Sequence, residues 1–415
     1  MKKKQVKVVL NIESIAYGGK GIAHLDGKVV FVPHTLPGEE IEAVIVRDFT
    51  DYSMAAAEKI LKPSHDRIES NCKMYAGTDN QGVEHFIDTP GCVYAYFSYP
   101  KEVEVKNEQF RSFLEPFTDT FSEPAASPEY LHYRNKIILH TMHDHGQVVL
   151  GYKEEKGDEV YDVTECPLAR TEINEKLKEI RAQNGFFSSI HDGMVVTLRM
   201  ASDGTVYWWR NKPPAKASWI KEQTAVGLIS VPLGGFFQIN NGVTDILIKK
   251  VMSRIKELAP ESVIDLYCGC GLFSVASHYA GIGKISGLDC VENSVKAAEY
   301  NARQHSLENS FFVADSADKG FEKLVAAHCG EFNVSEDDTV LIIDPPRGGM
   351  GHKVRKYIRK THFKGIIYIS CAPDTLRRDL KILTSSGYRV DDAQMLDMFP
   401  RTAHFESVVT LVREQ

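Results

Sequence analysis

The second half of the chain alternates short apolar strands with helical segments, and this alternation limits the fold more than any other feature. Strands are predicted at residues 263–266, 284–288, 311–313, 339–343, 365–370 and 407–412, and helices at 271–280 and 291–303. Strands that are joined by helices run parallel, and the helices then cover the two faces of the sheet. We therefore predict a doubly wound, mostly parallel, Rossmann-like α/β domain over residues 226–415.

The first half of the chain has two different patterns. Over residues 1–62, short alternating strands are separated by the turn residues Gly18-Gly19, Asp26-Gly27 and Pro37-Gly38, which predicts a small β-barrel of the OB type. Residues 63–225 mix helices at 101–114 and 170–182 with antiparallel strand pairs, which predicts a central α+β domain. RNA binding is one use of such a barrel, and a spacer is another.

Composition limits the class of protein. Hydrophobic residues make up 43% of the chain and charged residues 25%, as in ordinary globular proteins. No apolar run is long enough for a membrane span, and no signal-like core follows the first residues. Eight irregularly spaced cysteines indicate reduced thiols in the cytoplasm. The formal net charge of −7 does not by itself favour a nucleic-acid partner, although a local basic surface could still bind one.

A Gly-x-Gly turn follows the first strand of the alternating region, in Asp265-Leu266-Tyr267-Cys268-Gly269-Cys270-Gly271. Glycines such as Gly269 and Gly271 let the backbone approach a nucleotide-like ligand. The third glycine of a dinucleotide fingerprint is missing, which disfavours a pyrophosphate and suits S-adenosyl-L-methionine (SAM). Asp289 and Asp315 end the next two strands, where carboxylates can bind ribose hydroxyls or approach adenine.

Two further strand ends carry residues that suit catalysis. The loop Asp344-Pro345-Pro346-Arg347 is stiffened by its prolines, which leaves Asp344 available to a ligand. Cys371 follows another strand at the same edge of the predicted sheet, and Glu406 is an available acidic partner. A thiolate that adds to carbon-6 of uracil makes carbon-5 nucleophilic, and a base must then remove the carbon-5 proton.

The motifs around these residues resemble those of the RNA 5-methyluridine (uracil-C5) methyltransferases. Residues 370–379 resemble the family's Ser-Cys-Asn-Pro-x-Thr-Leu-x-Arg-Asp motif, and residues 397–406 its Asp-x-Phe-Pro-x-Thr-x-His-x-Glu motif. Further similarity lies at 133–136, 235–240, 265–273 and 344–347, and the barrel resembles the family's TRAM domain. The resemblance implies that Cys371 is the nucleophile and Glu406 the base. It also implies a set of residues that bind the cofactor or shape the pocket, namely Gln238, Tyr267, Asp289, Asp315 and Asp344.

The chain departs from the family pattern in two places. Ala372 replaces the asparagine that follows the nucleophile. TRAM-bearing members often hold an iron–sulfur cluster on four cysteines, whereas this chain offers only Cys72, Cys92 and Cys166, with Thr89 where another cysteine is expected. His85 could be a fourth ligand, but three thiolates do not complete such a site. We therefore expect SAM as the cofactor and no metal or cluster.

These observations favour a SAM-dependent methyltransferase that forms 5-methyluridine in structured RNA, with ribosomal RNA preferred to transfer RNA. The expected protein is a cytoplasmic monomer with no membrane partner. Two alternatives stay open. An amino-group methyltransferase could use the Asp344-Pro345-Pro346-Arg347 loop and would need no thiol. A catalytically weak or inactive RNA-binding protein on the same fold would agree with Ala372 and with the acidic composition.

Overall fold

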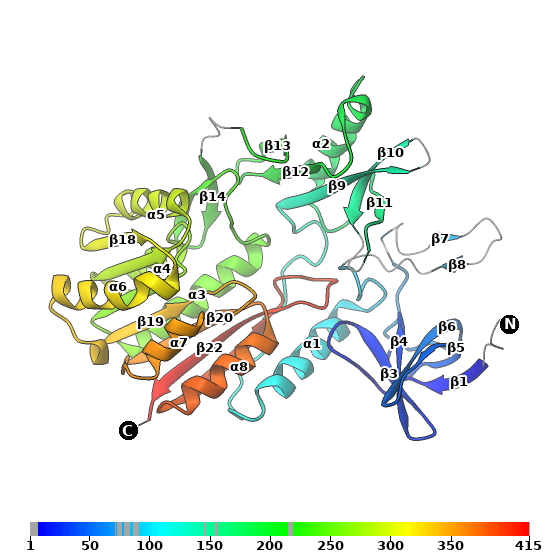
Figure 1. Ribbon diagram of the computed structural model, residues 1–415, viewed down its shortest axis with the longest axis horizontal. Helices are drawn as coiled ribbons and strands as arrows, with labels where there is room; N and C mark the ends of the chain where they lie inside the picture. The colour runs from blue at the N-terminus through cyan, green and yellow to red at the C-terminus, as the bar shows by residue number, and fades with distance from the viewer. Residues whose placement is uncertain are drawn as a thin grey trace.

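The computed structural model describes residues 7–70, 72, 77–78, 84–85, 91–144, 147–153, 157–214 and 219–414. Figure 1 shows an N-terminal barrel in blue, a second sheet in cyan and green, and a large sheet with helices that runs from yellow-green to red. Within the described ranges, no helix is both long and apolar enough to cross a membrane.

The N-terminal barrel is a six-stranded sheet in the order β1-β5-β6-β4-β3-β2, in which only the β4–β6 pair is parallel. Its alternate apolar side chains, among them Val30, Val32 and Ile41, form a buried core. Asp26-Gly27 joins β3 to β4 with both residues at positive φ, 52° and 81°, as a two-residue hairpin requires. The strands are β1 (Lys7–Asn11), β2 (Ser14–Ile15), β3 (Lys20–Leu25), β4 (Lys28–Pro33), β5 (Glu40–Asp48) and β6 (Tyr52–Lys62).

The central sheet is antiparallel throughout, in the order β11-β10-β9-β12-β13. Helix α2 buries Ile173, Leu177 and Ile180 in the same cluster as side chains of this sheet. The predicted antiparallel α+β pattern is thus confirmed. The elements are β9 (Lys136–Asp144), β10 (Gln147–Lys153), β11 (Val160–Asp162), α2 (Thr171–Ala182), η1 (Phe187–Ser189), β12 (Val195–Met200) and β13 (Val206–Arg210), with a short pair β7 (Gly77–Thr78) and β8 (Glu84–His85) before them.

The last domain is a seven-stranded sheet in the order β18-β17-β16-β19-β20-β22-β21. Strands β16 to β20 run parallel, as predicted, and β22 is antiparallel to both of its neighbours. The strands are β16 (Ser262–Leu266), β17 (Ile285–Asp289), β18 (Ser310–Ala314), β19 (Thr339–Ile343), β20 (Gly365–Ser370), β21 (Tyr388–Leu396) and β22 (Glu406–Arg413). The antiparallel hairpin β14 (Trp219–Thr224) and β15 (Gly227–Pro232) precedes the domain.

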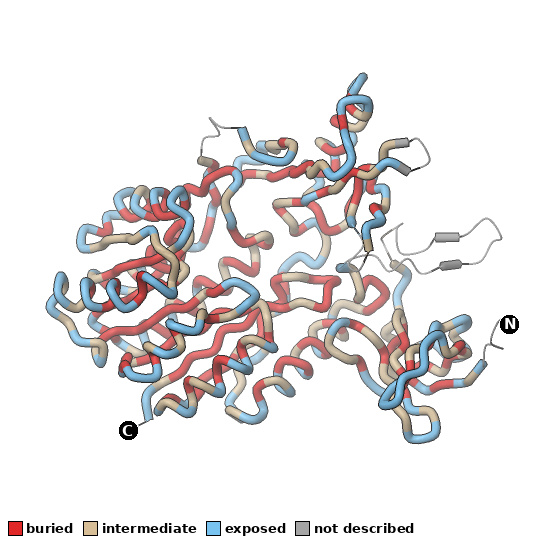
Figure 2. Tube along the Cα trace, in the orientation of Figure 1, coloured by how far each residue is buried: buried red, intermediate tan, exposed pale blue. Residues whose placement is uncertain are grey.

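Helices cover both faces of this sheet, so its strands are buried on both sides. Along β16, Val263 belongs to one buried cluster and Ile264 to the other, as the alternation of side chains in a strand requires. Figure 2 shows the central strands of this sheet as buried, whereas the edge strand β18 is half-buried. The helices are α3 (Asn241–Leu258), α4 (Leu272–Tyr279), α5 (Glu292–Gln304), α6 (Ala317–Phe332), α7 (His352–Ile358) and α8 (Pro373–Thr384), with the short η2 (Glu336–Asp338) before β19.

Helix α1 (Tyr99–Leu114) lies in the predicted central segment of the sequence but packs into the core of the last domain. Its Phe110 and Leu114 are fully buried in one cluster with Leu376, Tyr388 and Phe405. Figure 1 shows α1, in cyan, beside the orange α8. The helix therefore forms part of the support for the segment that leads into β22.

A buried ion network attaches α1 to that segment. Lys106 Nζ lies 2.7 Å from Glu102 Oε1 and 2.7 Å from Asp397 Oδ1, and all three side chains are fully buried. The Tyr99 hydroxyl donates to the second Asp397 oxygen at 2.8 Å, and the Arg401 amide donates to Glu102 at 2.6 Å. Because Asp397 and Arg401 lie in the segment between β21 and β22, the network fixes that segment against α1.

Replacing Lys106 by methionine should lower the free energy of unfolding by about 3–5 kcal/mol, because buried Asp397 would lose its cation and Glu102 would keep only Arg401. Urea denaturation of the full chain measures this. The matched control is Lys101→Met in the same helix, where Lys101 pairs with Glu104 at 2.6 Å but the two side chains are 22% and 54% exposed. That variant should lose less than about 1 kcal/mol. Equal losses in the two variants would contradict a special role for the network.

Candidate active site

The predicted site residues gather at one edge of the large sheet, where its parallel strands end. Three backbone hydrogen bonds hold neighbouring strand ends together: Tyr267 N to Leu288 O at 2.8 Å, Asp315 N to Asp289 O at 3.1 Å, and Asp344 N to Leu266 O at 3.3 Å. Tyr267, Asp289, Asp315 and Asp344 therefore come from four adjacent strands. This edge is where open α/β sheets bind ligands.

The glycine turn after β16 has an unusual backbone. Tyr267, Gly269 and Gly271 have φ values of 68°, 51° and 81°. Gly271 begins α4, and a Cβ atom there would lie 3.0 Å from the Cβ of Ala298, so the helix can approach only because the residue is glycine. The Asp289 carboxylate accepts from Gly269 N at 3.1 Å and from Val291 N at 2.8 Å. Asp289 thus holds the turn in place, and each of its oxygens keeps a further lone pair for a ligand.

Asp265 lies beneath the turn and was not among the predicted site residues. It is fully buried, and its Oδ2 accepts from the Ser274 hydroxyl at 2.6 Å. Its Oδ1 has no hydrogen-bond partner among the described residues. Burial raises the pKa of this carboxyl to about 7, with the nearby Asp289 charge adding to the effect. A buried acceptor without a donor is the signal that a ligand with a donor group completes the site.

Cys371 and Glu406 lie side by side at the next strand ends. Ser370 of β20 pairs with Ser407 of β22, so the residue after one strand is beside the first residue of the other. The Ser407 hydroxyl donates to Ser370 O at 2.9 Å and fixes this register. Cys371 is partly buried, whereas Glu406 is only 3% exposed and its Oε1 has no partner among the described residues.

Cys371, Glu406 and Asp344 disfavour one another's ionised forms. Burial raises the pKa of the Cys371 thiol to about 11, the Glu406 and Asp344 carboxyls add to the shift, and Arg347 counteracts it. Burial and Asp344 raise the pKa of Glu406 well above its usual value. Burial, followed by Asp265 and Asp289, raises the pKa of Asp344 to about 7. The three groups are therefore close enough that ionising one disfavours ionising the others.

Two predicted residues are held by other contacts. Gln238 is buried in the loop before α3, and its carbonyl accepts from Asn135 Nδ2 at 3.1 Å. The next polar residue of that loop, Asn240, donates to Met398 O at 3.4 Å, so the loop lies against the segment before Glu406. Burial raises the pKa of the Tyr267 hydroxyl to about 12, and that hydroxyl is engaged with the backbone of Gly351.

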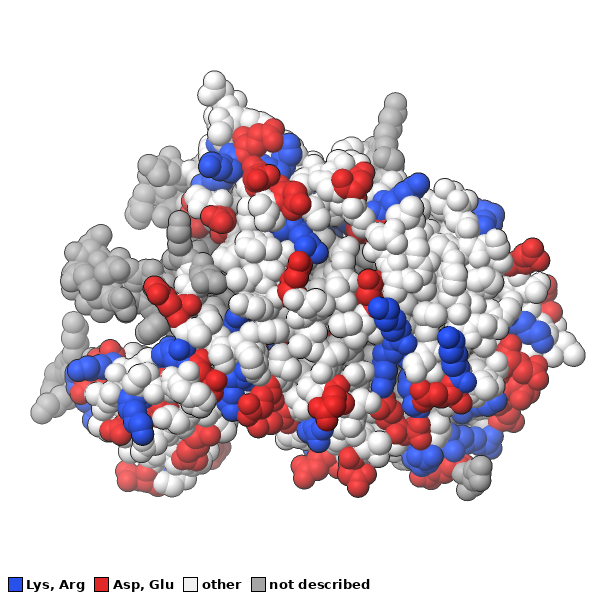
Figure 3. Space-filling view, turned by 180° about the vertical axis from the view of Figure 1, so that it is seen from behind, with Lys and Arg blue, Asp and Glu red and all other residues white. Residues whose placement is uncertain are grey.

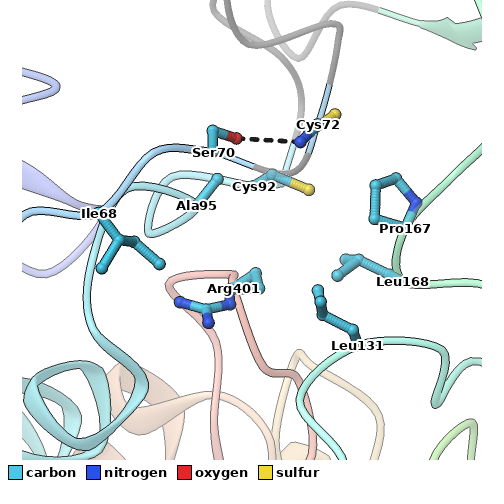
Figure 4. Close-up of a pocket in the computed structure, with 9 residues that line it drawn as sticks. All are labelled: Ile68, Ser70, Cys72, Cys92, Ala95, Leu131, Pro167, Leu168 and Arg401. Carbon is cyan, nitrogen blue, oxygen red and sulfur yellow. Dashed lines mark hydrogen bonds between the residues drawn. The ribbon is translucent and has the colours of Figure 1, made fainter.

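Two of the three candidate cluster cysteines lie at one small cavity, shown in Figure 4. Cys72 and Cys92 line it, and it has a volume of about 20 Å³, room for roughly one water molecule. Burial raises the pKa of the Cys92 thiol to about 12, with Cys166 and Cys72 adding to the shift. No three His, Cys, Asp or Glu side chains within the described ranges are arranged to hold a metal ion. Thr89 and the side chain of His85 lie outside those ranges, and the described thiols do not fit a four-cysteine cluster.

The surface around the fold agrees with the acidic composition. On the face shown in Figure 3, the described Lys and Arg side chains lie among Asp and Glu and form no continuous basic surface.

One exposed aromatic side chain was missed by the sequence analysis: Phe236, in the loop that carries Gln238, is 75% exposed. The double glycine before it is the signal that could have marked a loop presenting a side chain.

Comparison with known proteins agrees with this geometry. The family model tRNA (Uracil-5-)-methyltransferase matches residues 230–414, and the TRAM domain model matches residues 5–55. The chain is 26% identical to a tRNA (uracil(54)-C(5))-methyltransferase of Schizosaccharomyces pombe, over 99% of this chain and 78% of the relative. It is 26% identical to the 23S rRNA (uracil(1939)-C(5))-methyltransferase RlmD of Vibrio vulnificus, over 96% of this chain and 94% of the relative.

A solved structure shares the fold over nearly the whole chain. It is the Pyrococcus abyssi tRNA (uracil-54, C5)-methyltransferase in complex with S-adenosyl-L-homocysteine, with a TM-score of 0.71 and 22% identity, covering 97% of this chain and 99% of that one. With the two family models matching in the expected order, the chain belongs to the RNA uracil-C5 methyltransferase family, in the group that carries a TRAM domain.

Proposed function

We propose that this methyltransferase acts on a uridine of ribosomal RNA, with Cys371 as a covalent nucleophile and Glu406 as the base that removes the carbon-5 proton. The observation that carries the proposal is the register of β20 and β22, in which Ser370 pairs with Ser407 and brings the thiol beside a buried carboxyl group. A methyltransferase that acts on an amino group needs neither of these groups.

The residues at the strand ends fit SAM. Asp265 Oδ1, which has no partner among the described residues, suits the ammonium group of a methionyl moiety, because that cation would favour the ionised form of a carboxyl whose pKa burial raises. Asp289 retains lone pairs for ribose hydroxyls, and Asp315 ends the third strand, where the adenine would lie. When bound, SAM supplies an electrophilic methyl group on a sulfonium. The chain's own residues have to hold that methyl group opposite the ring and exclude water.

The uracil ring needs activation before it can accept a methyl group at carbon-5. The Cys371 thiolate forms a bond to carbon-6, and the electron pair of the carbon-5–carbon-6 double bond becomes available at carbon-5. After methylation Glu406 takes the carbon-5 proton. The ring double bond then re-forms and the bond between carbon-6 and sulfur breaks, which releases the thiolate.

The charges of the site suit this order of events. Two negative charges in one buried site disfavour each other, and the Glu406 carboxyl raises the pKa of the Cys371 thiol. Glu406 is therefore neutral while the thiolate attacks. Once the sulfur is bonded to carbon-6 its negative charge is gone, so Glu406 releases its proton to water and the resulting carboxylate acts as the base.

Ribosomal RNA is proposed as the target because the chain matches the 23S rRNA enzyme of V. vulnificus over 94% of that relative, although the P. abyssi tRNA enzyme shares the fold over a similar span. Phe236, which is 75% exposed, suits stacking on an unpaired base of such an RNA.

The affinity for SAM should fall by about ten- to a hundredfold in Asp289→Ala, because a charge-assisted hydrogen bond is worth roughly 1.5–3 kcal/mol. Calorimetry with the full chain measures this. Asp337→Ala is the control, since Asp337 is an exposed carboxylate that pairs with Arg413. Unchanged affinity in the Asp289 variant would remove that residue from the cofactor site.

Variants of the proposed nucleophile and of the proposed base should stop the reaction at different steps. Cys371→Ala should neither methylate RNA nor form a covalent adduct, because carbon-5 is never activated. Glu406→Gln should accumulate a denaturant-resistant protein–RNA band, because the adduct cannot eliminate. Cys329→Ala, which removes another partly buried thiol, should behave like the wild type. Methylation by the Cys371 variant would exclude the covalent mechanism and favour an amino-group methyltransferase.

RNA from a strain that lacks the gene should lose one 5-methyluridine in ribosomal RNA and none in transfer RNA. Mass spectrometry of the two purified RNA pools measures this, and re-expression of the wild type should restore the modification. A loss confined to transfer RNA would move the target there. No loss in either pool would favour the inactive RNA-binding alternative.

A further inference from the structure

The turn between β2 and β3 of the barrel extends to the candidate active site. Gly18 and Gly19 have φ values of 99° and 88°, and Ala16 N and Lys20 O close the turn at 2.8 Å. A Cβ atom on Gly19 would lie 2.7 Å from Val93, so the turn is seated tightly against the residues before α1. The Ile15 carbonyl accepts from Gln109 Nε2 of α1 at 3.2 Å. These contacts give the turn a defined position relative to the last domain.

Tyr17, at the tip of this turn, is packed between α1 and the catalytic segment. Its ring meets Phe113 edge to face at 5.4 Å between centroids and Phe405 at 6.0 Å. Phe405 is buried directly before Glu406. A side chain of the barrel therefore touches the residue next to the candidate base.

The hydroxyl of Tyr17 lies among the groups around the nucleophile. Burial and the Asp374 carboxylate raise its pKa to about 12, Arg347 counteracts the shift, and Cys371 adds to it. The hydroxyl is thus neutral at physiological pH and can both donate and accept a hydrogen bond. No described residue forms a hydrogen bond with it, so it is free to bind a ligand.

A groove of about 500 Å³ adjoins this side chain. It is lined by residues of the barrel, α1 and α8, including Ser14, Tyr17, Gln109, Phe113 and Arg377. Its volume is in the range of sites that hold small organic ligands. Arg377 is exposed and forms no ion pair with a described residue, which leaves a guanidinium available for a phosphate.

We propose that Tyr17 is a positioning residue of the catalytic pocket, where its ring forms a wall and its free hydroxyl hydrogen-bonds the target nucleotide of the RNA. An enzyme that modifies a base has to hold that nucleotide outside the stack, and such a pocket needs side chains that fix its orientation. The inference rests on the proposed function, since it assumes that a uridine enters beside Cys371. It makes the barrel a part of the active site as well as a possible RNA-binding module.

The test compares Tyr17→Phe and Tyr17→Ala with Tyr52→Ala, in the full chain. Tyr52 is another barrel tyrosine, and its ring contacts, with Phe31 and Phe49, lie within the barrel. The measurements are kcat and KM with an RNA that the wild type methylates, the rate of adduct formation with the same RNA carrying 5-fluorouridine at the target, SAM affinity, and the melting temperature.

Tyr17→Phe keeps the ring and should slow adduct formation about two- to tenfold, the effect of one lost hydrogen bond. Tyr17→Ala should lose more, while SAM affinity in both variants and the melting temperature of Tyr17→Phe stay at wild-type values. Tyr52→Ala should form the adduct at the wild-type rate. If Tyr17→Phe matches the wild type, the ring is only a packing element and the proposal is overturned. A wild type that methylates neither ribosomal nor transfer RNA would instead overturn the proposed function, and this inference with it.

Discussion

The buried ion network of Lys106, Glu102 and Asp397 is the interaction on which the arrangement of the site depends. A lysine without exposed surface is stabilised by two carboxylates that lie 2.7 Å from its nitrogen, and the lysine, with Arg401 beside Glu102, compensates the charges of those carboxylates. One carboxylate comes from α1 and the other from the segment that ends at Glu406. The polar contacts are directional, so they determine one relative position of the two segments, which apolar packing alone leaves less well defined. The barrel turn that carries Tyr17 rests on the same helix through Gln109.

The acidic groups at the sheet edge determine which ligand charge the site favours. Asp265, Asp344 and Glu406 all have pKa values raised chiefly by burial, and their neighbouring carboxyls add to the shift. A site of this kind favours a cationic ligand, because a positive charge relieves the mutual repulsion. SAM carries both a sulfonium and an ammonium group, so its binding and the ionisation of these carboxyls support each other. The same surplus of negative charge disfavours a phosphate backbone close to the cofactor.

Local patterns predicted the sheet well and the long-range contacts poorly. The apolar strands 263–266, 339–343 and 365–370 lie as expected, because a run of buried apolar residues between helices has few alternatives. The neighbourhood of Cys371 and Glu406 followed from a family resemblance, and the pairing of Ser370 with Ser407 supplies its physical cause. No local signal marked Lys106 as buried, since the charged residues Glu104 and Glu108 lie two positions to either side and its partner Asp397 is far away in sequence. The same holds for Tyr17, which follows an ordinary barrel strand and reaches the site only through the packing of two domains.

Ala372 shows how a departure from the family pattern can be read in physical terms. It is the residue at which α8 begins, and its side chain forms no capping hydrogen bond there. An asparagine at such a position accepts from a first-turn amide and stabilises the helix by about 0.5–2 kcal/mol relative to alanine. Without that acceptor, the amides of the first turn stay available at the helix N-terminus, where the helix dipole favours negative charge. Cys371 directly precedes this terminus, and the positive end of the helix dipole acts against the burial that raises the pKa of the thiol. The substitution therefore weakens the cap of α8. It does not remove the positive end of the α8 helix dipole, which favours the Cys371 thiolate and so counteracts the effect of burial on its pKa.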